Sequence, residues 1–363
     1  MTLLAALLTL QQGAFQFSET VLPDAAGKPS NLFINQMNGK RVGGPKFSPR
    51  SFGTPPRKLE FEWLTAGFVE GIEGPEQRDL RFRVYSQTRK ETGDPSFNVM
   101  RMLLRLWSTT RYEYGLEHNP TYNGGLVDVY LCDEGKPGGE QRFDVDDQQR
   151  PPAKVNTIYI YDIPSFTDPI EMAREVAHEY GHAVLPPVGG FKQPEDWANG
   201  YLGEKIYLRR YSREIAAGRL WSPDVMGADP GKLAAWVAKN VDPVTDAVAL
   251  RGPRMDLLKT SGKASMDAYL GVALWMEEAY GARLFARSAK LNGMADVTGY
   301  MESVQLAVSE PDRIEVTIPA RYSGKAIYLP VGKAKVEGAE VLLRKDSWVK
   351  IQPKGGSVVI VNR

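Results

Sequence analysis

Residues 174–191 read REVAHEYGHAVLPPVGGF and contain two of the only three histidines in a chain of 363 residues. His178 and His182 are four residues apart, and Glu179 lies between them. On an α-helix, residues i and i+4 share one face, so both imidazoles can point at one ion. Neutral imidazole is a good zinc ligand, and Glu179 is placed to take a proton from water beside the ion. The spacing predicts a metal site for amide hydrolysis rather than two solvated histidines.

The helix that carries this motif is expected to begin at Asp168 and Pro169, a capping residue followed by a first-turn proline. It is expected to end at Pro186. Its remaining face is apolar and would bury the helix against the rest of the domain. The residues of that face are Ile170, Met172, Ala173, Val176, Ala177 and Val184.

A zinc site of this kind needs a third protein ligand. The one remaining histidine, His118, lies upstream in LEHNPTYNGG, and three carboxylates follow the motif: Glu195, Asp196 and Glu204. We predict Glu204, because it falls inside a second long helix, expected over residues 197–218, which is a rigid platform. Glu195, in the preceding loop or first turn, stays open as the alternative, and it could equally serve as a helix cap.

Composition excludes several classes of function. The formal net charge is +1, which gives no electrostatic case for nucleic acid or an anionic membrane as a partner. The single cysteine, Cys132, excludes an internal disulfide and a thiolate-rich zinc site, and it is expected to be a buried strand residue. No run is long and apolar enough for a transmembrane helix.

The first 16 residues are interpreted as a signal segment. The apolar run from Leu3 to Leu10 resembles the core of a secretory signal, and Gly13 and Ala14 are small enough for cleavage. The positively charged start of such a signal is missing. We expect a secreted or extracytoplasmic protein; the alternative is a buried N-terminal element.

Composition divides the rest of the chain into three parts. Residues 17–78, rich in Gly, Pro, Asn and Ser, are expected to form an extended lead-in, and residues 79–302 the main domain. Residues 303–363 are expected to form a small β-sandwich-like domain. Its expected strands are VQLAVS, RIEVTIP, AIYLPV, EVLLRK, WVKIQ and SVVIV.

Within the main domain, LRFRVYS from Leu80 alternates apolar and polar residues and predicts a half-buried strand. An amphipathic helix is expected from Ser96, as its N-cap, to Gly115. Two strands follow, GLVDVYLC and VNTIYIYDI, with a polar loop between them. A third long helix is expected to run unbroken from Ser265 to Leu291.

HEYGH, followed by the Trp-x-Asn segment of WANGY and a helix with carboxylates, resembles the gluzincin metallopeptidases, the thermolysin-like and aminopeptidase-like zincins. The resemblance covers about residues 80–300. It implies an α+β zincin-like fold, with an amphipathic helix and an antiparallel sheet before the motif, bound Zn²⁺, and hydrolysis of peptide or protein substrates. It further implies a strand that holds the substrate by main-chain pairing, which we assign to Ile158–Ile160.

A further likeness concerns Tyr269 in DAYLGVALWMEEAYGARLF, 87 residues beyond His182. In the aminopeptidase-type stretch that it resembles, a tyrosine donates its phenol to the oxyanion of the tetrahedral intermediate. The alternative is that Tyr269 belongs to the apolar core with Leu270, Val272 and Met276.

The chain also departs from the family. In the aminopeptidase-like pattern a zinc-binding glutamate directly follows the Asn of Trp-x-Asn, but here Gly200 has that place and Glu204 is one helical turn further. Either Glu204 binds zinc, or the chain is a degenerate, non-catalytic binding protein of the same fold. A third reading makes residues 303–363 the binding part of a scaffold. The Gly-x-Met-Glu-Asn type strand that captures a free amino terminus is missing, so exopeptidase activity has no support.

Overall fold

The computed structural model describes residues 16–24, 26–38, 61, 63–71, 74, 77–87, 95–146, 151–293 and 295–362. The chain divides into two compact units. One comprises residues 1–107, 118–183 and 213–230, and the other residues 108–117, 184–212 and 231–363. Over the described ranges, no helix combines the length and the apolar character of a membrane span. The expected signal segment falls outside the described residues, apart from Gln16, where the first strand begins.

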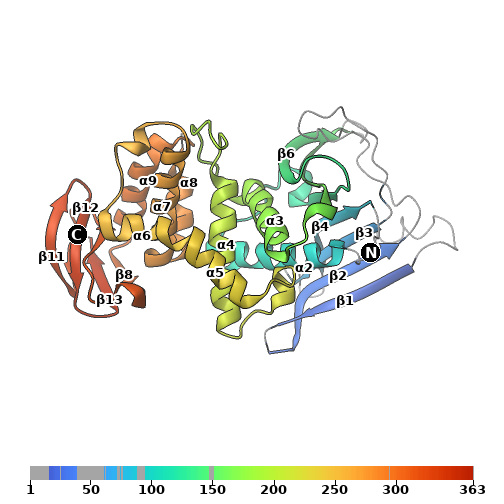
Figure 1. The fold of residues 1–363 in the computed structure, drawn as a ribbon, viewed down its shortest axis with the longest axis horizontal. Helices are drawn as coiled ribbons and strands as arrows, with labels where there is room; N and C mark the ends of the chain where they lie inside the picture. The colour runs from blue at the N-terminus through green and yellow to red at the C-terminus, as the bar shows by residue number, and fades with distance from the viewer. Residues whose placement is uncertain are drawn as a thin grey trace. The chain divides into compact units, whose positions relative to one another are not determined.

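The first unit is built on a mixed seven-stranded sheet. Its strands are β1 (Gln16–Pro23), β2 (Pro29–Asn38), β3 (Trp63–Glu70), β4 (Arg78–Ser86), β5 (Val127–Leu131), β6 (Gly138–Asp146) and β7 (Ala153–Tyr161). They are ordered β1-β2-β3-β4-β5-β7-β6. Figure 1 labels β1 to β4 and β6 of this sheet. Strand β5 is parallel to β4 and β7, and the other pairs are antiparallel, which corrects the purely antiparallel sheet that the resemblance implied. Strands on both sides of the expected boundary at residue 79 pair in this one sheet.

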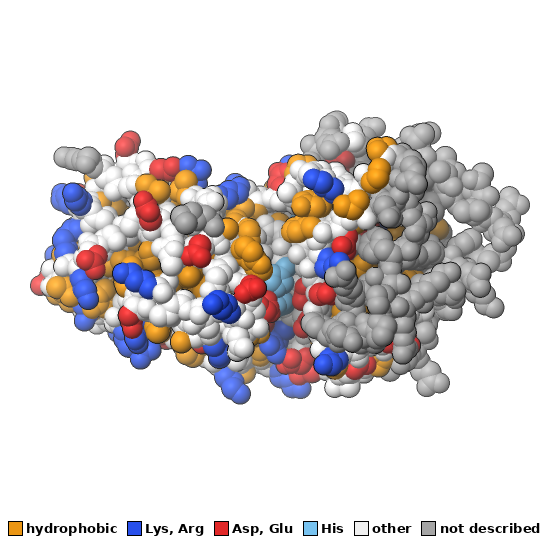
Figure 2. All heavy atoms as spheres, turned by 90° about the horizontal axis from the view of Figure 1, so that it is seen from above, with side chains coloured by type: hydrophobic (Ala, Val, Ile, Leu, Met, Phe, Trp, Pro, Cys, Tyr) orange, Lys and Arg blue, Asp and Glu red, His pale blue; other side chains and the backbone are white. Residues whose placement is uncertain are grey.

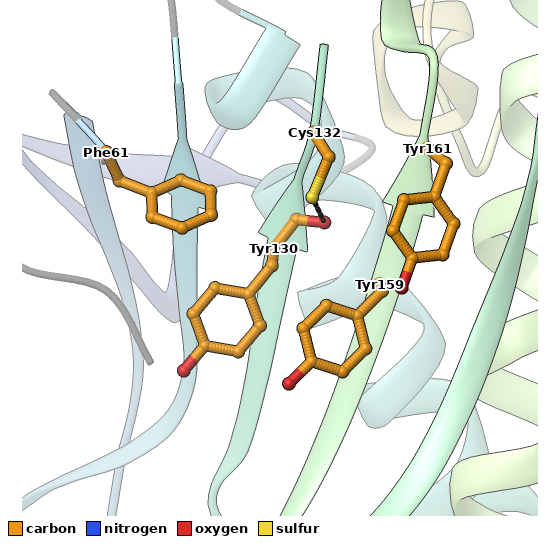
Figure 3. Close-up of a cluster of buried hydrophobic side chains, with 5 residues drawn as sticks. All are labelled: Phe61, Tyr130, Cys132, Tyr159 and Tyr161. Carbon is orange, nitrogen blue, oxygen red and sulfur yellow. Dashed lines mark hydrogen bonds between the residues drawn. The ribbon is translucent and has the colours of Figure 1, made fainter. Parts of the chain in front are cut away.

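The alternation expected in β4 is confirmed and separates two faces of the sheet. Phe82 and Val84 are fully buried on one face. On the other, Tyr130 and Tyr159 occupy paired positions and stack with ring centroids 5.0 Å apart (Figure 3). Cys132 lies buried in the same cluster, as expected, and burial raises the pKa of its thiol. A thiol that resists ionisation is a packing residue rather than a nucleophile.

Strand β6 was not expected from the sequence, which assigned this segment to a polar loop between the strands now labelled β5 and β7. It pairs antiparallel with β7 from Gly138 to Asp146 and forms one edge of the sheet. Strand β7 therefore has a neighbour on each side. The assignment of Ile158–Ile160 as the substrate-pairing strand is wrong, because the main chain of an interior strand is already paired.

The amphipathic helix expected after β4 is α2 (Pro95–Thr109). It begins at Pro95, so Ser96 is not its N-cap; the buried Ser96 hydroxyl instead bonds Thr65 Oγ1 of β3 at 2.8 Å. A π-helical turn, η1 (Thr110–Tyr114), continues it, and Gly115 ends it as expected, with a left-handed φ of 65°. Helix α2 packs on the sheet at Gly67, which has no side chain to keep Met100 and Leu104 away.

The second unit is mainly helical and ends in β-structure. The helices that lie wholly or mostly in it are α4 (Asn199–Ala216), α5 (Pro230–Asn240), α6 (Asp242–Arg251), α7 (Lys263–Tyr280), α8 (Ala282–Leu291) and α9 (Val297–Ser309). The helix expected to run unbroken to Leu291 is two helices, because Gly281 (φ 85°, ψ 165°) interrupts it. Short 3₁₀ turns elsewhere in the chain are η2 (Asn123–Gly125), η3 (Ile163–Ser165), η4 (Ser222–Val225), η5 (Leu257–Lys259) and η6 (Ala320–Tyr322).

Two three-stranded sheets form the C-terminal part, as the β-rich composition predicted. Their strands are β8 (Arg313–Thr317), β9 (Ile327–Pro330), β10 (Lys335–Glu337), β11 (Ala339–Lys345), β12 (Trp348–Pro353) and β13 (Ser357–Val361), in the orders β10-β13-β8 and β11-β12-β9. VQLAVS is not a strand but the end of α9. Val304, Ala307 and Val308 are buried at helical spacing, and the Asp296 carboxylate caps the start of this helix at the Thr298 N–H, 2.8 Å away.

Candidate metal centre

The motif lies on helix α3 (Pro169–Val184), with the ends that the sequence predicted. The Asp168 carboxylate accepts the Ile170 N–H at 2.9 Å and so satisfies one free donor of the first turn. The predicted apolar face is confirmed except at Val184, which is only partly buried. Ile170, Ala173, Val176 and Ala177 are buried.

The two motif histidines face each other. Their Nε2 atoms lie 3.2 Å apart and their ring centroids 4.9 Å apart. Ligand atoms at the usual zinc–nitrogen distance of about 2.0–2.1 Å are separated by roughly 3.3 Å across a tetrahedral ion, so this spacing fits. Two imidazole lone pairs that point at each other repel unless a proton or a cation lies between them.

A third side chain joins this pair. Ligand atoms of His178, His182 and Glu195 all lie within 4.8 Å of one another, and all three residues are partly exposed. Among the described residues, no other group of three His, Cys, Asp or Glu side chains gathers in this way. Figure 2 shows histidine atoms at the surface with acidic side chains next to them. Two imidazoles and a carboxylate are a donor set that suits Zn²⁺.

Glu195 is carried by a loop that turns back on itself. Gly189 bridges to Trp197, Ala198 N–H donates to Val188 O at 2.9 Å, and Gly262 N–H donates to Phe191 O at 2.6 Å. The indole of Trp197 covers Gly189, where a Cβ would clash with the ring. Glu195 thus sits on a hydrogen-bonded loop rather than on a helix.

Glu204, our expected third ligand, is not part of the group. It is buried in α4, with 3% of its surface exposed. The expected helix over residues 197–218 is present with slightly shorter bounds, so the helix itself was predicted correctly. Glu195, the open alternative, is the carboxylate that groups with the two histidines.

Glu179 is buried against the edge strand β6. A Cβ on Gly139 would lie 2.6 Å from Glu179 Cγ and 2.9 Å from its Cδ, so only glycine fits at this position. The Glu175 carboxylate, one turn earlier on α3, approaches the same point. The edge strand and the proposed base are therefore in direct contact, which places β6 beside the motif.

A histidine that sequence reasoning left aside supports this helix. His118 is buried; its Nδ1 lies 2.7 Å from Gly125 O and its Nε2 3.2 Å from the Tyr180 hydroxyl. Because a carbonyl only accepts, Nδ1 carries the proton and Nε2 accepts from Tyr180. Burial lowers the pKa of His118 to about 4; the hydrogen bond to Gly125 opposes this effect, and nearby Arg81 adds to it. Tyr180 in HEYGH was the sequence signal that could have pointed to His118, because a buried tyrosine hydroxyl needs a hydrogen-bond partner.

Tyr269 lies in the core of the second unit, with none of its surface exposed. Its ring packs against Phe191 and Tyr300, with centroids 5.6 and 4.8 Å away. Burial raises the pKa of its phenol well above the usual value, and Tyr300 adds to this. These surroundings favour the core alternative over a contact with substrate.

Neither a family model nor a curated protein matches the chain.

Proposed function

We propose that the chain is a zinc-dependent metallopeptidase of the zincin type, with His178, His182 and Glu195 as its zinc ligands. The observation that carries the proposal is the convergence of these three side chains, with the two Nε2 atoms 3.2 Å apart. Zn²⁺ held there would polarise a substrate carbonyl and lower the pKa of water toward about 7.

Glu179 is the proposed general base. It follows His178 on α3, and its carboxylate can take a proton from the attacking water and pass it to the leaving nitrogen. Its contact with Gly139 restricts the side chain, so the carboxylate is held beside the edge strand. His118 bonds Tyr180 and so supports the helix from its buried side.

Strand β6 replaces Ile158–Ile160 as the proposed substrate-aligning strand. It is an edge strand, and within the described part of the sheet it pairs only with β7. The free edge can accept an extended peptide by main-chain hydrogen bonds. Because Gly139 touches Glu179, a peptide on this edge would pass close to the proposed base.

The test compares Glu179→Gln with Glu171→Gln, a control in the first turn of the same helix. Each protein is loaded with zinc and assayed for cleavage of an unfolded protein such as casein. We expect Glu179→Gln to keep its zinc and to cleave about 10²–10⁴-fold more slowly, the range expected for loss of a general base. Glu171→Gln should behave like the wild type.

Cleavage by Glu179→Gln at the wild-type rate would remove Glu179 from the mechanism. A wild-type protein that holds zinc but cleaves nothing would instead favour the non-catalytic binding protein.

A further inference from the structure

The edge strand β6 exposes large apolar side chains on the same face as the motif helix. Phe143 and Val145 are 48% and 55% exposed. Residues 139, 141, 143 and 145 share one face because side chains alternate along a strand. Gly139, the first of them, packs against Glu179 of α3.

Two contacts fix how β6 runs along α3. At one end Gly139 meets Glu179. Further on, Phe143 pairs with Asn156 of β7, whose amide lies 3.4 Å from Ala183 O of α3. The Asn156 side chain also accepts from Gln141 Nε2 at 2.8 Å, which confirms that these residues lie on one face. Phe143 therefore lies toward the C-terminal end of α3, about 13 Å along the strand from Gly139.

The Tyr122 ring extends this apolar surface. It lies 4.3 Å from the Phe143 ring, centroid to centroid, with 31° between the ring planes. The opposite face of β6 carries Glu140, Arg142 and Asp144. The apolar residues are thus confined to the face of the strand that carries the motif helix.

We infer that Tyr122, Phe143 and Val145 form a subsite for an apolar or aromatic substrate side chain, which makes extended, unfolded polypeptides the substrate class. The inference rests on the proposed function. A peptide that pairs antiparallel with β6 runs opposite to it, so its residues before the scissile bond lie beside Phe143. The spacing from Gly139 places the recognised side chain three to four residues before that bond.

Such a subsite is filled only when the cleaved bond lies inside an extended chain. A substrate that bears only one or two residues before the cleaved bond would not reach Phe143. The geometry thus favours an endopeptidase, a choice that the sequence left open.

The test uses zinc-loaded full-length protein and a mixture of unfolded peptides of about twelve residues, with each cleaved bond located by mass spectrometry. Wild type is compared with Phe143→Ser, Val145→Ser and Leu342→Ser. Leu342 is a matched control, 48% exposed on β11. We expect apolar residues to be enriched three to four positions before the cleaved bond. The enrichment should disappear in Phe143→Ser and weaken in Val145→Ser, and Leu342→Ser should keep it.

A second readout does not need turnover. In the Glu179→Gln background, a fluorescent peptide cleaved by the wild type should bind about tenfold more weakly once Phe143→Ser is added, the effect of losing one apolar contact surface. Unchanged binding, or cleavage with no preference at those positions, would overturn the subsite while leaving the peptidase intact. No cleavage of any peptide by the zinc-loaded wild type would overturn the proposed function itself.

Discussion

Two clusters of ionisable side chains in this molecule are built in opposite ways. In the candidate metal centre, His178 and His182 turn their Nε2 atoms toward each other, a carboxylate of Glu195 joins them, and all three side chains are partly exposed. In the second unit, Arg209 is buried, with 1% of its surface exposed, and reaches Glu277 at 2.6 Å and Glu278 at 3.4 Å.

The Arg209 cluster satisfies its charges internally. Arg209 also donates to Leu274 O and Thr245 Oγ1, and Tyr114 donates to Glu277. Burial lowers the pKa of the guanidinium, but the two carboxylates outweigh this effect and the net pKa is raised. Arg321 of η6 adds a second guanidinium at Glu278 and joins the start of the C-terminal β-structure to α7.

The two arrangements suit different roles. Buried charges that are matched one to another hold elements together and leave no donor for a ligand. Partly exposed imidazole and carboxylate donors that converge on one point suit a cation. The two clusters should therefore respond to different measurements, one to stability and the other to zinc.

The largest expected effect on folding stability comes from the Arg209 cluster. Arg209→Met leaves two buried carboxylates without this partner and should lower the free energy of unfolding by about 3–5 kcal/mol. Chemical denaturation measures this, and zinc affinity at low temperature should stay unchanged. A variant as stable as the wild type would show that the cluster does not hold the second unit together.

A smaller effect on stability is expected from His118, which contacts Tyr180 of the motif helix. The pKa of His118 is about 4 in the folded chain and 6.5 as its ordinary value, so the unfolded chain binds more protons between these pH values. Stability is therefore full above pH 6.5 and falls as the pH drops toward 4, by about 3 kcal/mol at 1.36 kcal/mol for each pKa unit.

Denaturation curves at several pH values measure this loss, with His118→Asn as the comparison. The variant starts from a lower stability, since it disrupts the contacts with Gly125 and Tyr180, but it should lack this part of the pH slope. An identical slope in both proteins would assign the acid sensitivity to other groups.

Local signals in the sequence predicted much of the fold. Asp168 and Pro169 mark the start of α3 because capping is decided within one turn. The alternation in β4 and the C-terminal strand runs were visible for the same reason. VQLAVS failed because a short apolar run fits a strand or a helix equally well, and only the buried positions of α9 decide.

Tertiary structure decided what the sequence could not. The metal motif is local, with spacing set by one helix, so His178, Glu179 and His182 could be proposed directly. The choice between Glu195 and Glu204 as the proposed third ligand depends on the path of the loop before α4, which hydrogen bonds at Gly189 and Phe191 fix. The edge position of β6 likewise depends on strand order, which periodicity does not encode.

The most direct test of the central claim is a zinc titration, by calorimetry, of the wild type, Glu195→Gln and Glu204→Gln. The proposed zinc site predicts about one zinc per chain for the wild type. It predicts binding at least about 100-fold weaker for Glu195→Gln, since even the outer partners of a zinc ligand are worth 10–100-fold. Glu204→Gln should bind like the wild type. Zinc binding that survives in Glu195→Gln but is lost in Glu204→Gln, or a wild type that binds no zinc, would contradict the account.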